Sequence, residues 1–198
     1  MRSWFVAALV FCAVFAAAPQ AARADVWKID PPHTSVGFSV RHMMVSHVRG
    51  QFRKVSGTIA IDGKNPATFK ADVTIDAASI DTGVPARDEE LKSEDFLDVA
   101  KYPLIFFKSI TLAAAGPGKW KLTGNLTIRG VTRSVTLDVD GPAGPIKDPS
   151  GHLRAGASAS AAIKRRDFGI VWNHAIGSGG VLVGGQVLIS IDLEAVKQ

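Results

Sequence analysis

Residues 80–107 read IDTGVPARDEELKSEDFLDVAKYPLIFF, and they interrupt a chain in which apolar and polar residues otherwise alternate. Alternation of this kind is the pattern of half-buried β-strands. The stretch instead holds a Gly-Val-Pro break, a charged run from Arg87 to Glu90, and the isolated apolar residues Leu91 and Phe96. Because hairpin loops close in about two to five residues, we expect this longer connection to cover or gate something.

The same stretch predicts a short helical excursion. Pro85 and the acids that follow it suit the first turn of a helix, where negative charge meets the positive end of the dipole. Leu91 and Phe96 lie five residues apart, which is about 140° around a helix. One straight helix cannot turn both inward, so we expect two short helical turns that break near Ser93.

Outside residues 80–107, the apolar residues alternate in segments at hairpin-like spacing. The predicted strands cover residues 26–29, 34–42, 55–62, 69–76, 104–112, 120–129, 131–139, 152–163 and 187–194. Residues 141–151 contain three prolines and three glycines and are expected to form a loop. Gly184 and Gly185 are expected to form a turn before the last strand.

These eight or nine strands predict an all-β fold. No alternation of strands with helices is present, so the sheet is expected to be antiparallel. Closing the sheet into a barrel would remove its exposed edges. A sandwich of two sheets fits the pattern equally well.

The first 24 residues have the features of a secretory signal peptide. Arg2 is followed by an apolar run from Trp4 to Ala18 and by the Ala-Arg-Ala site of residues 22–24. At about 15 residues the run is short of the roughly 20 needed to span a bilayer, so we expect cleavage after Ala24 and no stable membrane span afterwards. Residues 25–198 would then be one exported, periplasmic domain.

Composition narrows the classes of partner. Cys12, in the leader, is the one cysteine, so the exported domain must be stabilised by an ordinary core without disulfides. The formal net charge is +5, and it would be lower once Arg2 and Arg23 are lost with the leader. Basic stripes with interleaved aromatic residues are absent from the sequence, so we expect no nucleic-acid partner. A homodimer is left open.

One predicted strand lacks large side chains on both faces. Residues 155–162 read AGASASAA. A closed core would leave a void beside this strand, and voids cost stability, whereas a lumen that holds a ligand would not. An eight-stranded barrel is of the size at which either arrangement occurs. The alternative is that opposing aromatic residues fill the space, namely Phe38, Phe52, Phe69 and Phe107.

Candidate catalytic and metal sites are weak. Asp81-Thr82-Gly83 matches the triplet of aspartic proteases, but those enzymes need two such carboxylates, so a strand-end turn is the better interpretation. The histidines show no spacing typical of a metal site, and we expect none. His42 shares a face with Val36 and Phe38 and is expected in or near the lumen. The Lys164-Arg165-Arg166-Asp167 cluster could hold an anionic head group or pair with Asp88 or Glu89.

Several motifs together resemble a known family. The chain opens with Trp27-Lys-Ile-Asp30-x-x-His33-Thr34-x-Val36-x-Phe38-x-Val40-x-His42. Later motifs include Arg87-Asp88-x-x-Leu91-Lys92-Ser93-x-Asp95-Phe96, Tyr102-Pro103-x-Ile105-x-Phe107, and Arg165-x-Asp167-Phe168-Gly169. This combination resembles the YceI-like family of exported, lipocalin-like proteins over nearly all of residues 25–198.

The resemblance implies a lipocalin-like, eight-stranded barrel that binds a long isoprenoid, a quinone-like molecule or a similar amphipathic lipid, with no other cofactor and no catalytic residues. On this hypothesis the polar end is formed by His42, Arg87 and Arg165. Leu91 and Phe96 anchor a lid, with Arg87-Asp88 as its electrostatic latch. The expected contacts of the apolar tail are Val36, Phe38, Val40, Ile59, Val73, Ile75, Phe107, Leu126 and Ile189.

Two other functions remain open from the sequence. One is an envelope hydrolase that uses His42 with Asp88 or Asp167. The other is a structural or stress-protective protein of the periplasm whose barrel is filled and holds no ligand.

Overall fold

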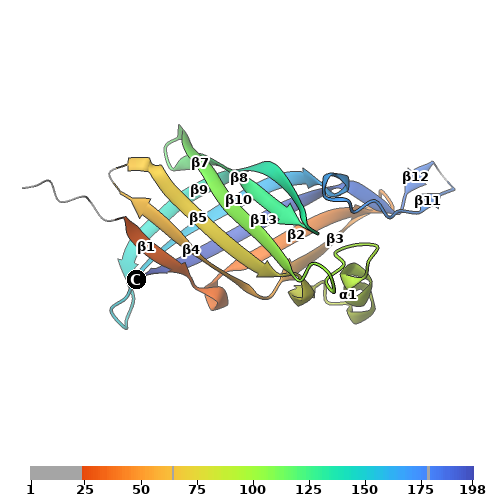
Figure 1. Cartoon of the computed structure of the whole chain (residues 1–198), viewed down its shortest axis with the longest axis horizontal. Helices are drawn as coiled ribbons and strands as arrows, with labels where there is room; N and C mark the ends of the chain where they lie inside the picture. Colours follow the sequence, from red (N-terminus) through yellow and green to blue (C-terminus); the bar gives the residue numbers. More distant parts are fainter. Residues whose placement is uncertain (1–23, 64, 178) are drawn as a thin grey trace, which may run out of the picture.

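Antiparallel pairing joins the strands of the main sheet in the computed structural model, which describes residues 24–63, 65–177 and 179–198 (Figure 1). Apart from Ala24, the predicted leader lies outside the described residues. Within the described part of the chain, no helix is long and apolar enough to cross a membrane.

The elements follow one another in a β-rich order. The strands are β1 (Asp25–Ile29), β2 (Ser35–His42), β3 (Ser46–Phe52), β4 (Val55–Asp62), β5 (Asn65–Asp76), β6 (Ile80–Asp81), β7 (Leu104–Gly116), β8 (Lys119–Ile128), β9 (Val131–Lys147), β10 (Leu153–Lys164), β11 (Ala175–Ile176), β12 (Gly180–Val181) and β13 (Val183–Lys197). The helices are α1 (Pro85–Lys92) and the 3-10 helices η1 (Pro31–His33), η2 (Ala77–Ser79) and η3 (Arg165–Phe168).

Eight strands close into a ring. Their order is β1-β4-β5-β7-β8-β9-β10-β13, and β13 pairs back with β1 at Trp27↔Lys197 and Ile29↔Ala195. The predicted antiparallel barrel is therefore confirmed, and the two-sheet sandwich is wrong. A closed ring leaves its eight strands without the free edges of an open sheet.

One edge of β13 is shared by two strands. Residues 183–192 of β13 pair with β2, and residues 195–197 pair with β1. The break between β1 and β2 falls at η1, where two consecutive prolines lack the N–H groups that a ladder needs. Beyond β2, the sheet continues through β3 to β6, so this side of the barrel extends past the ring at one end.

Alternating residues give the barrel an apolar interior and a polar outside. On β8 and β9, Leu122 and Leu137 are buried, whereas the neighbouring hydroxyls of Thr123 and Thr136 form a hydrogen bond of 2.9 Å on the exposed face. The period-two pattern therefore predicted the inward faces of these strands correctly.

The loop predicted at residues 141–151 is largely a strand. β9 continues to Lys147 and still pairs with β10, with register shifts around Gly156. Gly141 and Gly144 adopt φ values of 130° and 96°, each before a cis proline. The prediction was wrong because prolines are tolerated at irregular positions where no ladder N–H is required; only residues 148–152 form the turn.

The turn predicted at Gly184-Gly185 is also part of a strand, since both residues lie inside β13. A Cβ atom on Gly184 would lie 2.9 Å from the Cβ of Arg41. The glycine is therefore explained by the close approach of β2 rather than by a reversal of the chain.

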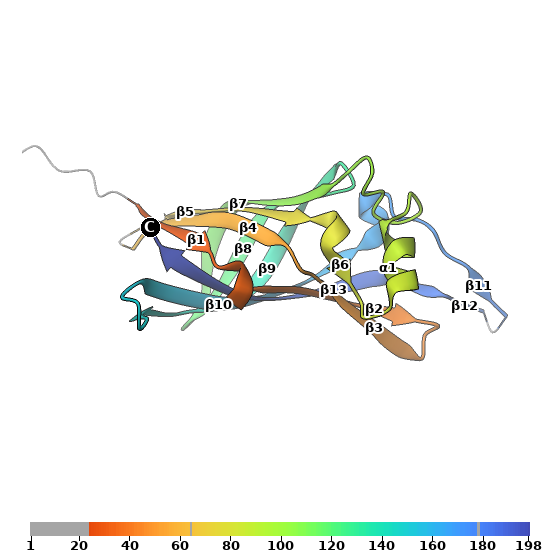
Figure 2. The same cartoon turned by 90° about the horizontal axis from the view of Figure 1, so that it is seen from below.

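The central excursion begins and breaks as predicted. Pro85 stands at the first turn of α1, and the helix ends at its C-cap residue Ser93. The second helical turn is not a helix: the N–H groups of Phe96 and Asp98 both donate to the carbonyl of Ser93, in a series of turns. Figure 2 shows α1 at the end of the barrel opposite the end marked C.

Candidate functional site

A cavity of about 800 Å³ runs through the barrel. Apolar side chains from the ring strands and from β2 and β3 form most of its wall. Its volume lies in the range of about 300–1,000 Å³ that is usual for small-molecule sites. The barrel is therefore not filled by its own side chains.

The small residues of β10 account for part of this space. Ala155, Gly156, Ala157 and Ala159 all lie on the cavity wall. Of the two alternatives that the sequence left open for this strand, the structure has the unfilled lumen. The four aromatic residues considered as filling line the cavity too, but they do not close it.

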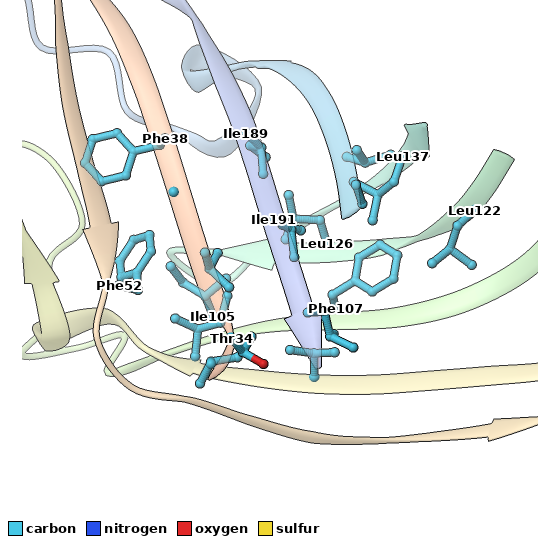
Figure 3. A pocket seen from close by; sticks show the side chains of 18 of the residues that line it. Thr34, Phe38, Phe52, Ile105, Phe107, Leu122, Leu126, Leu137, Ile189 and Ile191 are labelled. Carbon is cyan, nitrogen blue, oxygen red and sulfur yellow. The ribbon is translucent and has the colours of Figure 1, made fainter. Parts of the chain in front are cut away.

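All nine residues predicted to contact an apolar tail lie on the cavity wall, although ligand contact itself stays a prediction. They are Val36, Phe38, Val40, Ile59, Val73, Ile75, Phe107, Leu126 and Ile189. Figure 3 shows several of them converging on one space.

The middle of the cavity offers few polar atoms. Among the side chains labelled in Figure 3, Thr34 alone carries an oxygen. Its hydroxyl is engaged by the backbone of Glu194, with the N–H of Glu194 at 3.2 Å. Phe38 and Phe52 face the same space, with 5.9 Å between their ring centroids. Such a wall recognises an apolar chain and gives little directional selectivity.

Polar side chains gather at the end that α1 covers, which we call the mouth. Arg41, His42, Arg87 and Glu90 line the cavity there, beside the apolar residue Leu91. The predicted polar end and the predicted lid thus occur at the same end of the barrel. The opposite end is lined by Asp25 and Asp62, together with Pro142 and Pro145.

The two predicted lid anchors differ in burial. Phe96 is 7% exposed, and its ring lies 5.2 Å from that of Trp172, centroid to centroid. Leu91 on α1 is half-buried and also lines the cavity. Phe96 is therefore a core residue of the mouth, whereas Leu91 sits at its surface.

Arg87 and Asp88 hold the turn before α1. The Arg87 guanidinium donates to the Thr82 hydroxyl at 2.8 Å and to the Thr82 carbonyl at 3.0 Å. Asp88 accepts from the Thr82 N–H and hydroxyl, at 2.9 and 2.5 Å. The predicted latch therefore closes within its own segment, and the pairing of Asp88 or Glu89 with Arg165 or Arg166 is wrong: Glu89 pairs with Lys92.

The Asp-Thr-Gly triplet is a structural turn. Asp81 accepts the N–H of Gly83 at 2.8 Å and the Nε–H of Arg53 at 2.7 Å. The Gly83 hydrogen bond, followed by that of Arg53, lowers the pKa of Asp81. A carboxylate held in this way is a cap rather than half of a catalytic dyad.

Arg165 is buried, at 4% exposure, and its guanidinium is surrounded by backbone carbonyls. It donates to Gly184 at 3.0 Å, Ile170 at 2.9 Å and Trp172 at 2.7 Å. Burial, with a smaller contribution from neighbouring Arg166, lowers its pKa. Arg165 lines the cavity but mainly fastens the segment after η3 to β13.

His42 lies at the mouth without an acidic partner. Within the described residues, no hydrogen bond or ion pair joins it to Asp88, Asp167 or another carboxylate. The pair that the hydrolase hypothesis requires is therefore not formed in this structure.

A second cluster, missed by the sequence reasoning, lies where η1 meets β13. Side chains of Asp30, His33 and Glu194 come within 4.8 Å of one another, close enough to share a cation. Arg154 already binds Asp30 at 2.5 Å and Glu194 at 2.6 Å. Its guanidinium takes the place that a metal ion would need. No local spacing could reveal this cluster, because Asp30, Arg154 and Glu194 lie far from one another in the chain.

Trp172 and Leu97 at the mouth were also missed. Both belong to irregular segments, where periodicity carries no information about direction. Trp120, in the predicted strand of residues 120–129, also lines the cavity.

Comparison with known proteins shows which family this chain resembles. The family model of the YceI-like domain matches residues 27–195. The chain belongs to the YceI-like family. Among YceI-like relatives, protein YceI of Escherichia coli O157:H7 is 41% identical over 164 residues, which cover 82% of this chain and 84% of that protein. A UPF0312 protein of Pseudomonas aeruginosa is 40% identical over 83% of this chain and 86% of its own.

Several solved structures share the fold. BcnA of Burkholderia cenocepacia superposes with a TM-score of 0.71 at 27% identity, covering 84% of this chain and 98% of its own. The Campylobacter jejuni YceI protein gives 0.66 at 32% identity, with 79% and 89% covered. A domain from Saccharophagus degradans described as polyisoprenoid-binding gives 0.64 at 16% identity, with 87% and 98% covered, and shows the common fold alone.

Proposed function

We propose that this protein binds a long-chain isoprenoid or a similar amphipathic lipid inside the barrel, and that it sequesters or carries this lipid. The observation that carries the proposal is the cavity of about 800 Å³ with an apolar wall. The fold shared with the polyisoprenoid-binding domain of Saccharophagus degradans supports it.

Burial of the tail supplies the binding free energy. Each CH₂ group removed from water contributes about 0.8 kcal/mol, so a long tail binds tightly without any hydrogen bond. The cavity is preformed by the ring of strands, which reduces the ordering cost of binding. Because apolar contacts are not directional, this wall would accept related tails of suitable length and width.

The polar head of the ligand is proposed to lie at the mouth. Arg87 and Arg165 already donate to protein oxygens. The ring of His42, in contrast, makes no hydrogen bond with the described residues. His42 is therefore the best placed of the three predicted polar residues to contact a head group.

Export to the periplasm stays part of the proposal and rests on the leader-like residues 1–24. A carrier is required where an apolar molecule must cross water between two membranes. A bound lipid or quinone-like molecule is the one ligand we propose, and the homodimer remains a prediction.

Extraction of the purified protein followed by mass spectrometry tests this function. We expect about one long-chain isoprenoid or related lipid for each chain. A protein that carries no lipid, and takes up neither a long-chain prenol nor an isoprenoid quinone when these are offered, overturns the proposal. In parallel, loss of turnover of an envelope ester in a folded His42→Ala variant would establish the hydrolase instead.

A further inference from the structure

Two hairpins project from the mouth end of the barrel. The β2–β3 hairpin turns at residues 43–45, and the β11–β12 hairpin lies beside it. In Figures 1 and 2 both reach beyond α1, away from the end marked C. They touch: the Met43 N–H donates to the Leu182 carbonyl at 2.8 Å, and a Cβ on Gly180 would lie 3.5 Å from the Met44 Cγ.

The turn of the β2–β3 hairpin exposes large apolar side chains. Met43, Met44 and Val45 are 42%, 47% and 81% exposed. Met43 and Met44 have φ values of 48° and 64°, and the Val45 N–H donates to the His42 carbonyl at 3.0 Å. Positive φ at both central residues is typical of a type I′ turn, for which Asn-Gly is strongly preferred. Two methionines at these positions cost conformational energy and leave apolar surface exposed to water.

Positive charge surrounds this apolar turn. Arg41 lies opposite His47 in the β2–β3 register and Arg49 lies two positions further on, so all three share one face of the hairpin. Arg41 also borders the cavity. Each is exposed, and none forms an ion pair with the described residues. Residues 31–61 contain no aspartate or glutamate, and neither do residues 168–191, which include the second hairpin. The acids of this end lie on β6, on α1 and the segment after it, and on η3. Both hairpins reach beyond α1 (Figure 2).

The exposed turn is continuous with the cavity. Leu182, Val183 and His42 line the cavity. His42 precedes the β2–β3 turn, and Leu182 and Val183 follow β12. The base of the second hairpin is fixed, because the Asn173 side chain binds both the N–H and the carbonyl of Val183. The cavity therefore opens next to the exposed apolar side chains of the β2–β3 turn.

We propose that the docking tip, defined as Met43, Met44 and Val45 with the exposed bases Arg41, His47 and Arg49, inserts into an anionic lipid bilayer and places the mouth against it. Exposed apolar residues beside arginines match the interfacial region of a membrane with anionic head groups. The inference rests on the proposed function, because it supplies the route by which a lipid enters and leaves the cavity.

Co-sedimentation of the full chain with vesicles tests this docking. The probes are vesicles of phosphatidylcholine alone and vesicles with 30% phosphatidylglycerol, at low salt and at 0.5 M salt. Wild type is expected to prefer the anionic vesicles, and added salt should weaken its binding. Arg41→Gln with Arg49→Gln is expected to lower affinity for anionic vesicles roughly 30-fold at low salt. Because all variants carry the same residues 1–23, differences in vesicle binding between them are due to the docking tip.

The decisive variant combines Met43→Asn with Met44→Gly. It gives the turn its preferred residues, so the melting temperature should stay unchanged or rise while vesicle affinity falls roughly tenfold or more. If this variant fails to fold, Val45→Ser tests the same surface. The control is Ile146→Asn, which removes a 66% exposed apolar residue near the opposite end and should leave binding unchanged.

Two outcomes overturn the docking proposal: wild type shows no preference for anionic vesicles, or the tip variants bind them as wild type does. In either case the tip would be a candidate surface for a protein partner instead. Lipid extraction from the same variants separates the two proposals. Tip variants that retain lipid but no longer sediment leave the proposed function standing, whereas a lipid-free protein that still sediments contradicts that function and not the docking.

Discussion

The ring of Phe96 lies against the indole of Trp172, with 5.2 Å between the ring centroids and 46° between the ring planes. This contact joins the segment after α1 to the segment after η3, across the mouth of the cavity. It makes the central excursion a packed part of the barrel end and not a free flap.

Replacement of Phe96 by alanine tests this contact. The ring is buried, so its loss should lower the free energy of unfolding by about 3–4 kcal/mol, measured by urea denaturation. Release of bound lipid should accelerate as well. Val84→Ala, at an exposed position of the same excursion, is the control and should change stability by less than about 0.5 kcal/mol.

Leu91→Ala tests whether α1 acts as a lid or as part of the core. Leu91 is half-buried at the cavity surface, so we expect little loss of stability and a clear increase in the rate of lipid release. Stopped-flow transfer to acceptor vesicles measures that rate. An unchanged release rate would show that α1 does not limit the exit of the ligand.

Filling the lumen should exclude the ligand without unfolding the barrel. Ala159→Leu points a larger side chain into the cavity beside other small residues of β10. We expect less bound lipid per chain and a melting temperature that is unchanged or higher, since added apolar atoms find empty space. Ala162→Leu, on the exposed face of the same strand, should retain wild-type lipid content. Equal lipid content in both variants would argue against binding in the lumen.

Arg165→Leu should destabilise the mouth. The substitution leaves the buried carbonyls of Ile170, Trp172 and Gly184 without their donor, at a cost of about 3 kcal/mol in unfolding free energy. Arg166→Leu, its exposed neighbour, is the control and should have a small effect. A stable Arg165→Leu protein would mean that other groups satisfy these carbonyls.

Acid should weaken the cluster around Arg154. Hydrogen bonds from Arg154, and next from the His152 N–H, lower the pKa of Asp148 to about 2. The Arg154 hydrogen bond is also the main cause that lowers the pKa of Asp30. A carboxyl whose folded pKa is depressed stabilises the fold above its unfolded pKa. We therefore expect this stabilisation in full above about pH 4 and its loss as the pH falls toward 2. In Arg154→Met the unfolding free energy should depend less on pH across this window.

The sequence predicted the walls of the cavity better than its mouth. Val36, Phe38 and Val40 were placed correctly because a strand sends alternate side chains to one face, whatever its neighbours are. The role of Trp172 could not be predicted, because an irregular segment has no period. Arg165 is held by backbone carbonyls, which every residue type has, so the sequence does not reveal them. Arg154 binds Asp30, which lies far from it in the chain.

Proline also misled the prediction for a physical reason. Pro142 and Pro145 are typical of loops, yet β9 accommodates them where its register with β10 shifts. Local propensity describes the residue, whereas the tolerance of a strand for irregularity depends on the neighbouring strand.

The pairing of β1 with β13 has a consequence for the order of folding. The ring closes through residues 27–29 and 195–197, which are separated by almost the entire described chain. β1 can pair with β4 early, but it cannot pair with β13 until residues 195–197 have been synthesised. Until then each emerging intermediate keeps an open edge and a lumen exposed to water. Contacts of such long sequence separation form slowly, so the time between synthesis and closure is the period in which this protein is most exposed to chaperones, proteases and aggregation.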